Sequence, residues 1–448
     1  MYIDNEIERI RQKYHNQPEF VQSIEEVFCS AKPLIEAHPE YQKADLLHRM
    51  AEPERMFRFR VVWTDDEGKV RTNVGYRCQF NGAIGPYKGG LRFQKNINES
   101  IIKFLAFEQT YKNALTGLPI GGGKGGSDFD PAGRSEDEIM RFCQSFMTAL
   151  YRYIGPDIDV PAGDMGVGRK EIGYLFGQYR RLKGNFENGV ITGKGLSYGG
   201  SLIRPEATGY GAVYFLNEVL KHENDKLEGK RIGVSGYGNV AWGIIKKAAE
   251  LGAKVTYMSG PDGYVHDEEG ICTKEKIDFV QELRLTDPLH CKPYADRFGC
   301  EFVPGKKFWG TKDVDIYMPA AVQNDVDEVS AQKIIDSGVK YYIEVANMPT
   351  TAQALEMLRG CKDIIVAPSK AVNAGGVGVS ALEMSQNSER LSWSEEEVDE
   401  LLHLMMKNIH KNSMIAASEF NLGYDLVAGA NIAGFKKVAE AMMEQGVF

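Results

Sequence analysis

The sequence predicts an α/β protein with two domains, the first a mixed α/β domain and the second a doubly wound parallel sheet. The 448 residues exceed the usual size of one domain. A strand hairpin set among helical stretches marks the first half, and beyond about residue 200 short apolar strands alternate with helices. We expect the domains to span residues 1–199 and 200–420, with a last helical segment over 421–448.

Composition and charge argue against several classes of protein. The chain is 43% hydrophobic and 26% charged, which is typical of a soluble globular protein. Its net charge is −9 without a long basic run, so we expect no nucleic-acid partner. No apolar stretch approaches the ~20 residues that span a bilayer, and the charged N-terminus does not resemble a signal peptide.

Cysteine and histidine usage favours a reducing environment without a metal site. The seven cysteines form no C-x-x-C pair, and their odd number argues against a disulfide framework. The eight histidines form no H-E-x-x-H motif. We therefore expect a cytoplasmic protein that binds no metal.

The predicted first domain begins with helices and continues with strands. Residues 1 to about 55 carry isoleucine and phenylalanine at helical spacing and lack glycine. Over residues 56–81 the period changes to alternation, interrupted by an acidic turn that ends in glycine, which indicates a hairpin. This region supplies packing surfaces and no evident chemistry.

Two lysines follow in glycine-rich stretches. Lys88 lies in residues 85–93, and Lys124 lies among five glycines in residues 118–130, which we interpret as a loop. A P-loop is excluded, because Leu118 stands where its first glycine is required. An isolated Gly-Lys-Gly is more often a solvated lysine on a surface loop. If Lys124 is instead held in a cleft with little water, its pKa falls and it can act as an acid or base.

Further candidates for chemistry lie on either side of Lys124. Gln109 and Lys112 are three residues apart on a predicted helix, so they project from one face. Asp157, Asp159 and Asp164 lie in a stretch rich in glycine and proline, where carboxylates usually cap turns. We assign that structural role to the first two and retain Asp164, which is flanked by glycines, as the candidate for catalysis.

A glycine motif in the second domain predicts a dinucleotide site. An apolar strand over 230–235 leads into Gly236, Gly238 and Asn239, which open a helix in the pattern G-x-G-x-x-A. Within alternating strands and helices this motif is typical of a Rossmann-like domain, whose helix N-terminus binds pyrophosphate. Residues 259–270 contain Asp262 and other acids but no lysine or arginine. A ribose 2′-phosphate would be repelled there, so we expect NAD, with NADP as the less favoured alternative, and Asp262 as a cofactor residue.

Three lysines in one glycine-rich half suggest an anionic ligand. If Lys88, Lys112 and Lys124 line one cleft, their mutual repulsion lowers at least one pKa, and a dianion relieves it. A small dicarboxylate uses two of the cations and leaves one for chemistry.

The combination of motifs resembles the glutamate dehydrogenases of the compact bacterial hexameric class. The motifs that carry the resemblance span nearly the whole chain: Gly85-Pro-Tyr-Lys88-Gly-Gly-Leu-Arg92-Phe, Pro119-Ile-Gly-Gly-Gly-Lys124-Gly-Gly, Pro161-Ala-Gly163-Asp164-Met-Gly, Arg204-Pro-Glu-Ala-Thr208-Gly-Tyr-Gly211, Gly236-Tyr-Gly-Asn239-Val and Ala371-Val-Asn373-Ala-Gly-Gly-Val-Gly-Val-Ser380. The resemblance implies a homohexamer and an active site in the cleft between a substrate-binding, oligomerisation domain and a dinucleotide-binding domain. It also implies that the terminal helix returns to the first domain.

The resemblance also implies roles for individual residues in the conversion of L-glutamate to 2-oxoglutarate and ammonium. Lys124 and Asp164 are expected to be catalytic, with Asp164 moving protons. The residues expected to bind substrate or cofactor are Lys88 and Ser380 for the γ-carboxylate, Lys112 and Gln109 for the α-carboxylate, the backbone around Gly163 beside the amino group, and Thr208 and Asn239 for the cofactor.

Two other functions are consistent with parts of the sequence. Related dehydrogenases of leucine, phenylalanine or valine are similar around the catalytic lysine but carry an apolar residue at the position of Lys88. An ammonium facing an apolar substrate would be desolvated without a partner, at a cost of several kcal/mol, which favours glutamate. A non-catalytic dinucleotide sensor would be expected to lack Lys124 or Asp164, and both are present.

Overall fold

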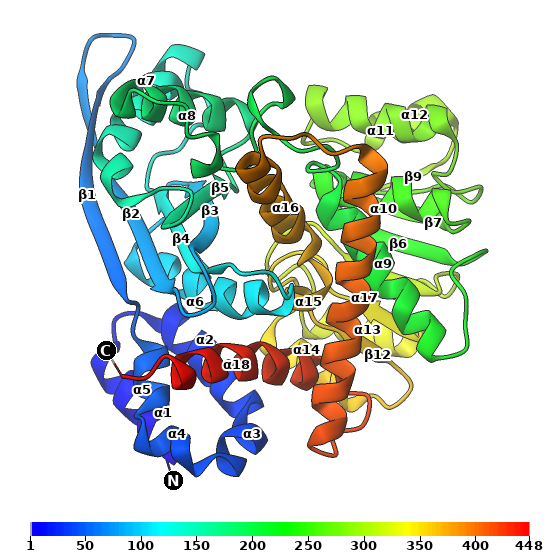
Figure 1. Ribbon diagram of the computed structural model, residues 1–448. Helices are drawn as coiled ribbons and strands as arrows, with labels where there is room; N and C mark the ends of the chain where they lie inside the picture. Colours follow the sequence, from blue (N-terminus) through cyan, green and yellow to red (C-terminus); the bar gives the residue numbers. More distant parts are fainter. Residues whose placement is uncertain (1, 448) are drawn as a thin grey trace.

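The N-terminal helices form a base beneath a first β-sheet in the computed structural model, which describes residues 2–447 (Figure 1). Their apolar residues, among them Ile3, Ile7 and Ile10, are buried in one cluster, as the helical spacing predicts. The helices of the base are α1 (Tyr2–Lys13), α2 (Pro18–Ser30), α3 (Lys32–Ala37), α4 (Pro39–Lys43) and α5 (Leu46–Ala51). Residues 1 and 448, at the ends of the first and last expected segments, lie outside the described residues.

The first sheet is mixed, with strand order β1-β2-β4-β3-β5. The predicted hairpin is confirmed, since the first two strands pair antiparallel. The second strand also pairs antiparallel with the fourth, and the last two strand pairs are parallel. The strands are β1 (Arg55–Thr64), β2 (Val70–Asn81), β3 (Tyr87–Phe93), β4 (Gly121–Ser127) and β5 (Asp159–Gly163).

The glycine-rich stretch around Lys124 is a strand, so its interpretation as a loop is wrong. All seven residues of β4 are buried between β2 and β3. A Cβ on Gly122 would collide with Thr110 of the helix above the sheet, and one on Gly126 would collide with the carbonyl oxygen of Arg92. Glycine therefore allows close approach of neighbouring backbone, and it also removes the alternating side chains from which a strand is recognised.

Helices cover both faces of this sheet. One face packs on α6 (Glu99–Leu115) and the helical base, and the other on α7 (Glu136–Leu150) and α8 (Arg169–Lys183). A capping box of Ser135 and Glu138 starts α7. Short 3₁₀ helices follow at Tyr151–Tyr153, Asn188–Val190 and Leu196–Tyr198.

The second sheet has the predicted parallel core and an antiparallel edge. Its order is β12-β11-β10-β6-β7-β8-β9, and the pairs from β12 to β7 are parallel, whereas β8 and β9 pair antiparallel. The strands are β6 (Arg231–Ser235), β7 (Lys254–Gly260), β8 (Gly263–His266), β9 (Glu301–Pro304), β10 (Ile316–Pro319), β11 (Tyr341–Ile343) and β12 (Ile365–Ala367).

Helices complete the second half and connect it to the first. They are α9 (Ala207–His222), α10 (Asn239–Glu250), α11 (Lys274–Thr286), α12 (Lys292–Phe298), α13 (Glu328–Ser337), α14 (Ala352–Gly360), α15 (Ser369–Val372), α16 (Gly375–Glu389), α17 (Glu395–Glu419) and α18 (Leu426–Glu444). Figure 1 shows α16 and α17 between the two sheets and α18 running back across the helical base, where it contacts α2 and α6.

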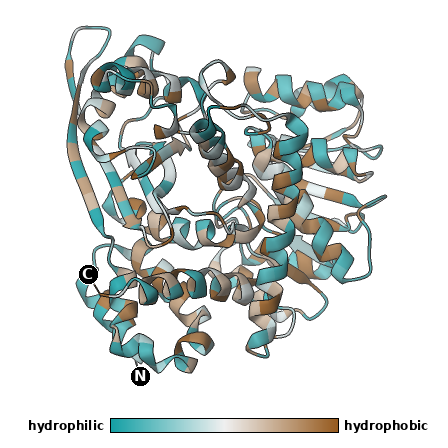
Figure 2. Cartoon of the chain, viewed as in Figure 1, coloured by the Kyte–Doolittle hydropathy of each residue, from teal (hydrophilic) through white to brown (hydrophobic). Residues whose placement is uncertain are grey.

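The distribution of hydropathy follows this arrangement. Figure 2 shows both hydrophilic and hydrophobic residues along α11 and α17, as expected of helices that expose one face and bury the other. Among residues 2–447, none of the helices combines the length and hydrophobicity needed to cross a membrane.

Candidate active site

A cleft between the two sheets collects residues from both halves of the chain. The first half contributes β3, β4, the end of β5 and α6, and the second contributes the start of α9, the segments after β10 and β11, and the start of α16. Within the described residues, five basic side chains and two acidic ones line this cleft. They are Lys88, Arg92, Lys112, Lys124 and Arg204, with Glu19 and Asp164.

Three adjacent strands position the central charges of the cleft. Lys124 lies in β4, and the neighbouring strand β3 carries Lys88 and Arg92 at alternate positions of one face, since successive strand residues point to opposite sides. Asp164 directly follows β5, whose last residue, Gly163, lies opposite Leu91 of β3.

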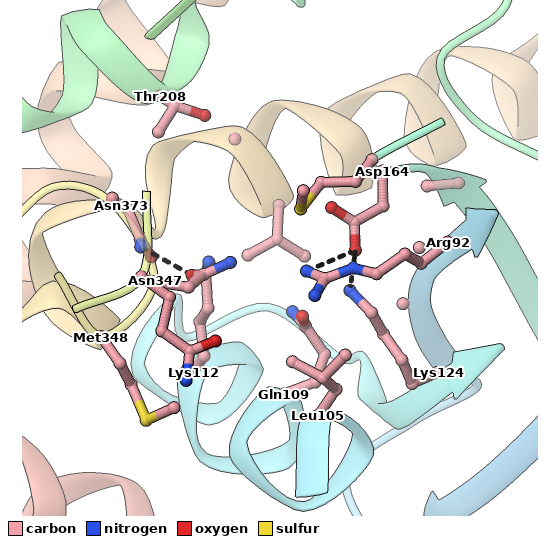
Figure 3. Close-up of a pocket in the computed structure, with 18 of the residues that line it drawn as sticks. Arg92, Leu105, Gln109, Lys112, Lys124, Asp164, Thr208, Asn347, Met348 and Asn373 are labelled. Carbon is pink, nitrogen blue, oxygen red and sulfur yellow. Dashed lines mark hydrogen bonds and ion pairs between the residues drawn. The ribbon is translucent and has the colours of Figure 1, made fainter. Parts of the chain in front are cut away.

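Lys124, Asp164 and Arg92 form one ionic cluster (Figure 3). The Lys124 Nζ lies 2.5 Å from Asp164 Oδ2, and the same oxygen lies 3.2 Å from both Nε and Nη2 of Arg92. Burial lowers the pKa of Lys124; its bond to Asp164 counteracts this shift, and Arg92 adds to it. Burial of Asp164 opposes its ionisation, but the charges of Lys124 and Arg92 outweigh burial and hold its pKa below the ordinary value.

Lys112 and Gln109 share the cleft-facing side of α6, as their spacing predicts. Both line the cavity, and the Gln109 amide donates to Asn113 Oδ1 at 2.6 Å. Burial and the nearby charge of Lys124 lower the pKa of Lys112 to about 7. An anion bound beside Lys112 would restore its charge near neutral pH.

Lys88 and Ser380 both line the cleft and are linked through Thr192. Lys88 is fully buried, and its Nζ donates to the Val160 carbonyl oxygen at 3.1 Å and to Thr192 Oγ1 at 2.8 Å. The Thr192 hydroxyl also bonds to that of Ser380 on α16. Burial, followed by the charge of Arg204, holds the pKa of Lys88 well below its ordinary value.

A second cavity adjoins the first at the glycine motif of β6 and α10. Gly236, Gly238 and Asn239 line it, and Gly236 has φ of +84°, which glycine adopts without strain. No side chain caps the N-terminus of α10, so its amide donors are available to an anion. These features fit a dinucleotide pyrophosphate.

The two cavities share part of their lining, including Val240 and residues 320–322. A ligand bound at α10 can therefore extend into the cleft. Thr208, at the start of α9, lines the cleft on the side of the second half, as do Asn347 and Asn373 (Figure 3).

Known proteins match the chain over both halves. Residues 199–446 match the family described as Glutamate/Leucine/Phenylalanine/Valine dehydrogenase, and residues 53–181 match the Glu/Leu/Phe/Val dehydrogenase, dimerisation domain. The chain belongs to the Glutamate/Leucine/Phenylalanine/Valine dehydrogenase family.

Individual members of this dehydrogenase family are similar over their full length. The NAD-specific glutamate dehydrogenase of Clostridium symbiosum is 62% identical over 446 residues, covering 100% of this chain and 99% of the relative. The NAD(P)-specific glutamate dehydrogenase of Xylanibacter ruminicola is 53% identical, with 99% of each chain covered. A solved structure titled glutamate dehydrogenase has a TM-score of 0.98 and 62% identity, covering 100% of this chain and 99% of the other.

In this chain, the Asp262 carboxylate is hydrogen-bonded within the protein. Its oxygens accept hydrogen bonds from the backbone N–H groups of Cys291 at 2.9 Å and Lys292 at 3.1 Å, at the start of α12. Asp262 does not appear among the described residues that line the second cavity, although its neighbours Pro261 and Gly263 do. A bond from Asp262 to the cofactor ribose remains a prediction.

The tertiary structure also brings cations to the cofactor cavity of this dehydrogenase. Arg284, Lys306 and Lys307 line it, although residues 259–270 contain no cation. Lys307 is paired with Asp325 at 3.0 Å. The expected repulsion of a 2′-phosphate rests on residues 259–270 alone. These three cations are also part of the electrostatic surroundings of the cofactor cavity.

The sequence predicted no role for two residues of this dehydrogenase that bear on the cleft, Arg204 in its lining and Thr192 behind Lys88 and Ser380. Thr192 connects Lys88 to Ser380 and precedes Gly193-Lys194-Gly195, a further glycine-flanked lysine that could have drawn attention to it. Arg204 begins one of the family-like motifs, but the sequence suggested no role for it. It lines the cleft, and its Nε is buried without a hydrogen-bond partner among the described residues. Among residues 2–447, no group of three or more His, Cys, Asp or Glu side chains is placed to hold a metal ion.

Proposed function

We propose that this chain catalyses the reversible oxidative deamination of L-glutamate to 2-oxoglutarate and ammonia, with NAD as the preferred hydride acceptor. The observation that carries the proposal is the excess of basic groups in the cleft, where Lys88 on β3 and Lys112 on α6 come from different elements. Each of these two lysines has a lowered pKa, and an anion would stabilise its charged form. A five-carbon diacid presents one carboxylate to each lysine.

The two substrate carboxylates are assigned to different residues of the cleft. Lys88 and Ser380 would bind the γ-carboxylate, where Thr192 and Arg204 offer further donors. Lys112 and Gln109 would bind the α-carboxylate. The backbone around Gly163 would then lie beside the amino group, next to Asp164.

Lys124 and Asp164 are assigned the proton transfers. Gly236, Gly238, Asn239 and Thr208 would hold the dinucleotide, which would supply the redox chemistry as the acceptor of hydride from the substrate Cα. Water then attacks the resulting substrate imine, and Lys124, in its neutral form, removes a proton from that water. The Lys124 ammonium stabilises the oxyanion that develops, and Asp164 transfers protons to and from the nitrogen. The lowered pKa of Lys124 supports its part as a base.

Lys88 is the basis for choosing glutamate over the leucine, phenylalanine or valine substrates in the family description. Its side chain is fully buried, and within the described residues no carboxylate is paired with it by hydrogen bond or ion pair. An apolar substrate side chain would leave that cation without a counter-charge, at a cost of several kcal/mol.

Initial rates of reductive amination test the proposal. The absorbance of reduced nicotinamide is followed with ammonium, NADH or NADPH, and either 2-oxoglutarate or the 2-oxo acid of leucine. We expect fast oxidation with 2-oxoglutarate and a preference for NADH. The Lys124→Ala variant, purified in the same way, controls for contaminating activity. Preference for the leucine analogue would refute the substrate assignment, and a clear NADPH preference would refute the coenzyme assignment.

The assembly and location proposed are a homohexamer in the cytoplasm. Strand β1 supports an assembly, because it is an edge strand with one side unpaired within the chain, and it lies in the segment matched to the dimerisation domain. We assign residues 1–199 to substrate binding and oligomerisation and residues 200–420 to the dinucleotide. Residues 421–448 would form a helical segment that returns to the first domain. Light scattering coupled to size-exclusion chromatography tests the hexamer.

A further inference from the structure

Arg92 touches the carboxylate to which the proposed function assigns proton transfer. Its Nε and Nη2 both lie 3.2 Å from Asp164 Oδ2, the oxygen that also bonds to Lys124. The Asp164 Oδ1 has no side-chain partner among residues 2–447, and Figure 3 shows it directed away from both cations. The side-chain contacts therefore hold Asp164 through one oxygen and leave the other free of them, and the backbone N–H of Met165 is a further hydrogen-bond partner of the carboxylate.

The fold of the first sheet accounts for this arrangement. Arg92 and Gly90 lie on one face of β3, the strand between the one that carries Lys124 and the one that leads into Asp164. A Cβ on Gly90 would lie 2.8 Å from the Cβ of Asp164, so glycine at this position leaves the space that the carboxylate side chain occupies. The guanidinium then reaches Asp164 from two residues further along the same strand.

We propose that Arg92 is a positioning residue for Asp164, which it holds with the free oxygen turned toward the substrate nitrogen. This inference rests on the proposed function, in which Asp164 exchanges protons with that nitrogen. Arg92 does not replace Lys124, because the guanidinium keeps its proton at every physiological pH and cannot act as the base.

A role for Arg92 as an anchor for a substrate carboxylate fits the geometry less well. Its side chain is only 12% exposed, and its fork is directed to Asp164. The anchoring groups Lys88 and Lys112 also line the cleft, and Lys88 has its own partners in the Thr192 hydroxyl and the Val160 carbonyl. Arg92 therefore acts on the substrate through Asp164.

The charge of Arg92 also affects the pH at which the neighbouring groups ionise. It lowers the pKa of both Asp164 and Lys124. The other charged groups that face this pair are Lys112 on α6, Arg204 before α9, and Arg77 on β2, whose guanidinium is bound to Asp159. Removing the Arg92 charge leaves these groups in place, so the pKa values of Asp164 and Lys124 should both rise.

The Arg92→Met and Arg92→Lys variants test the proposal. Glutamate turnover is measured over a range of pH, together with inhibition by glutarate, a dicarboxylate without the amino group. For Arg92→Met we expect kcat to fall about 10- to 100-fold, within the range for loss of general acid–base catalysis, while the inhibition constant of glutarate stays within about 2-fold. The rise of kcat/KM with pH should move to higher pH, because Lys124 then loses its proton later. Arg92→Lys should recover much of the kcat.

Specific results would overturn the role of Arg92. A glutarate inhibition constant that rises as much as kcat/KM falls would make Arg92 a carboxylate anchor. A loss of kcat with an unmoved pH profile would make its role merely structural, and unchanged kinetics would remove any role. If Arg92→Met does not fold, the pH profile of Arg92→Gln, which also lacks the charge, decides the question. Absence of glutamate turnover in the wild type would instead refute the proposed function itself.

Discussion

Replacing Lys88 by leucine tests the recognition of the γ-carboxylate. Lys88 is fully buried, with its ammonium on Thr192 and the Val160 carbonyl. Leucine removes the charge while keeping an apolar side chain that fills part of the space. Loss of a hydrogen bond to a charged group costs ~1.5–3 kcal/mol, and a carboxylate left partly unsatisfied adds ~1–3 kcal/mol.

The expected total of about 3 kcal/mol or more corresponds to roughly a 100-fold loss of kcat/KM for glutamate, since each ~1.4 kcal/mol is a factor of ten. Norvaline, in which a methyl group replaces the γ-carboxylate, should become a better substrate than it is for the wild type. Initial rates of amino-acid oxidation measure both effects. The matched control is Lys95→Leu, which removes an exposed lysine just beyond β3 and should change kcat/KM less than about 2-fold.

Unchanged kcat/KM and KM for glutamate in Lys88→Leu would refute the assignment of Lys88 to the γ-carboxylate. Thermal denaturation separates a binding effect from a folding effect. Within the described residues Lys88 is not ion-paired with a carboxylate, so its removal leaves no buried counter-charge uncompensated. The variant should therefore unfold at a Tm close to that of the wild type.

Three further predictions concern other buried lysines. Lys124→Ala should lower kcat by well over 10-fold while glutarate still binds; more than about a tenth of wild-type activity, a barrier change under ~1.4 kcal/mol, would contradict its catalytic role. Because the pKa of Lys112 is about 7, glutarate should bind with net proton uptake above pH 7 and weaken as pH rises further. Calorimetry in buffers of different ionisation enthalpy detects that uptake, and its absence would argue against Lys112 as an anchor. Lys194→Met should destabilise the fold by ~3–5 kcal/mol, because Glu383, its fully buried partner at 2.7 Å, is left unpaired; an unchanged Tm would contradict this.

Local sequence patterns predicted most elements of the fold. The alternation over residues 56–81 and the G-x-G-x-x-A motif report on backbone geometry within a few residues, and both elements were found where expected. The strand that carries Lys124 was missed, because a strand of glycines has no alternating side chains to reveal it. The antiparallel edge formed by β8 and β9 was missed as well.

In the candidate site, too, local patterns revealed some residues and missed others. Its glycine-flanked lysines could be recognised in the sequence because the glycines are adjacent to them. The positions of Thr192 and Arg204 could not, since they come from segments far from β3 and β4. The surroundings of Asp262 could not be predicted either, because its carboxylate accepts hydrogen bonds from backbone N–H groups at the start of α12, far along the chain; its contact with the cofactor stays a prediction.

The sequence by itself determined the family, the two-sheet architecture and the types of charged group available for catalysis, because these follow from residue identity and short-range spacing. The tertiary structure decided which charges share a carboxylate and which cations reach the cofactor cavity. Electrostatic interactions depend on the distance between groups and on the water around them, and in this cleft packing between residues distant in the chain sets both.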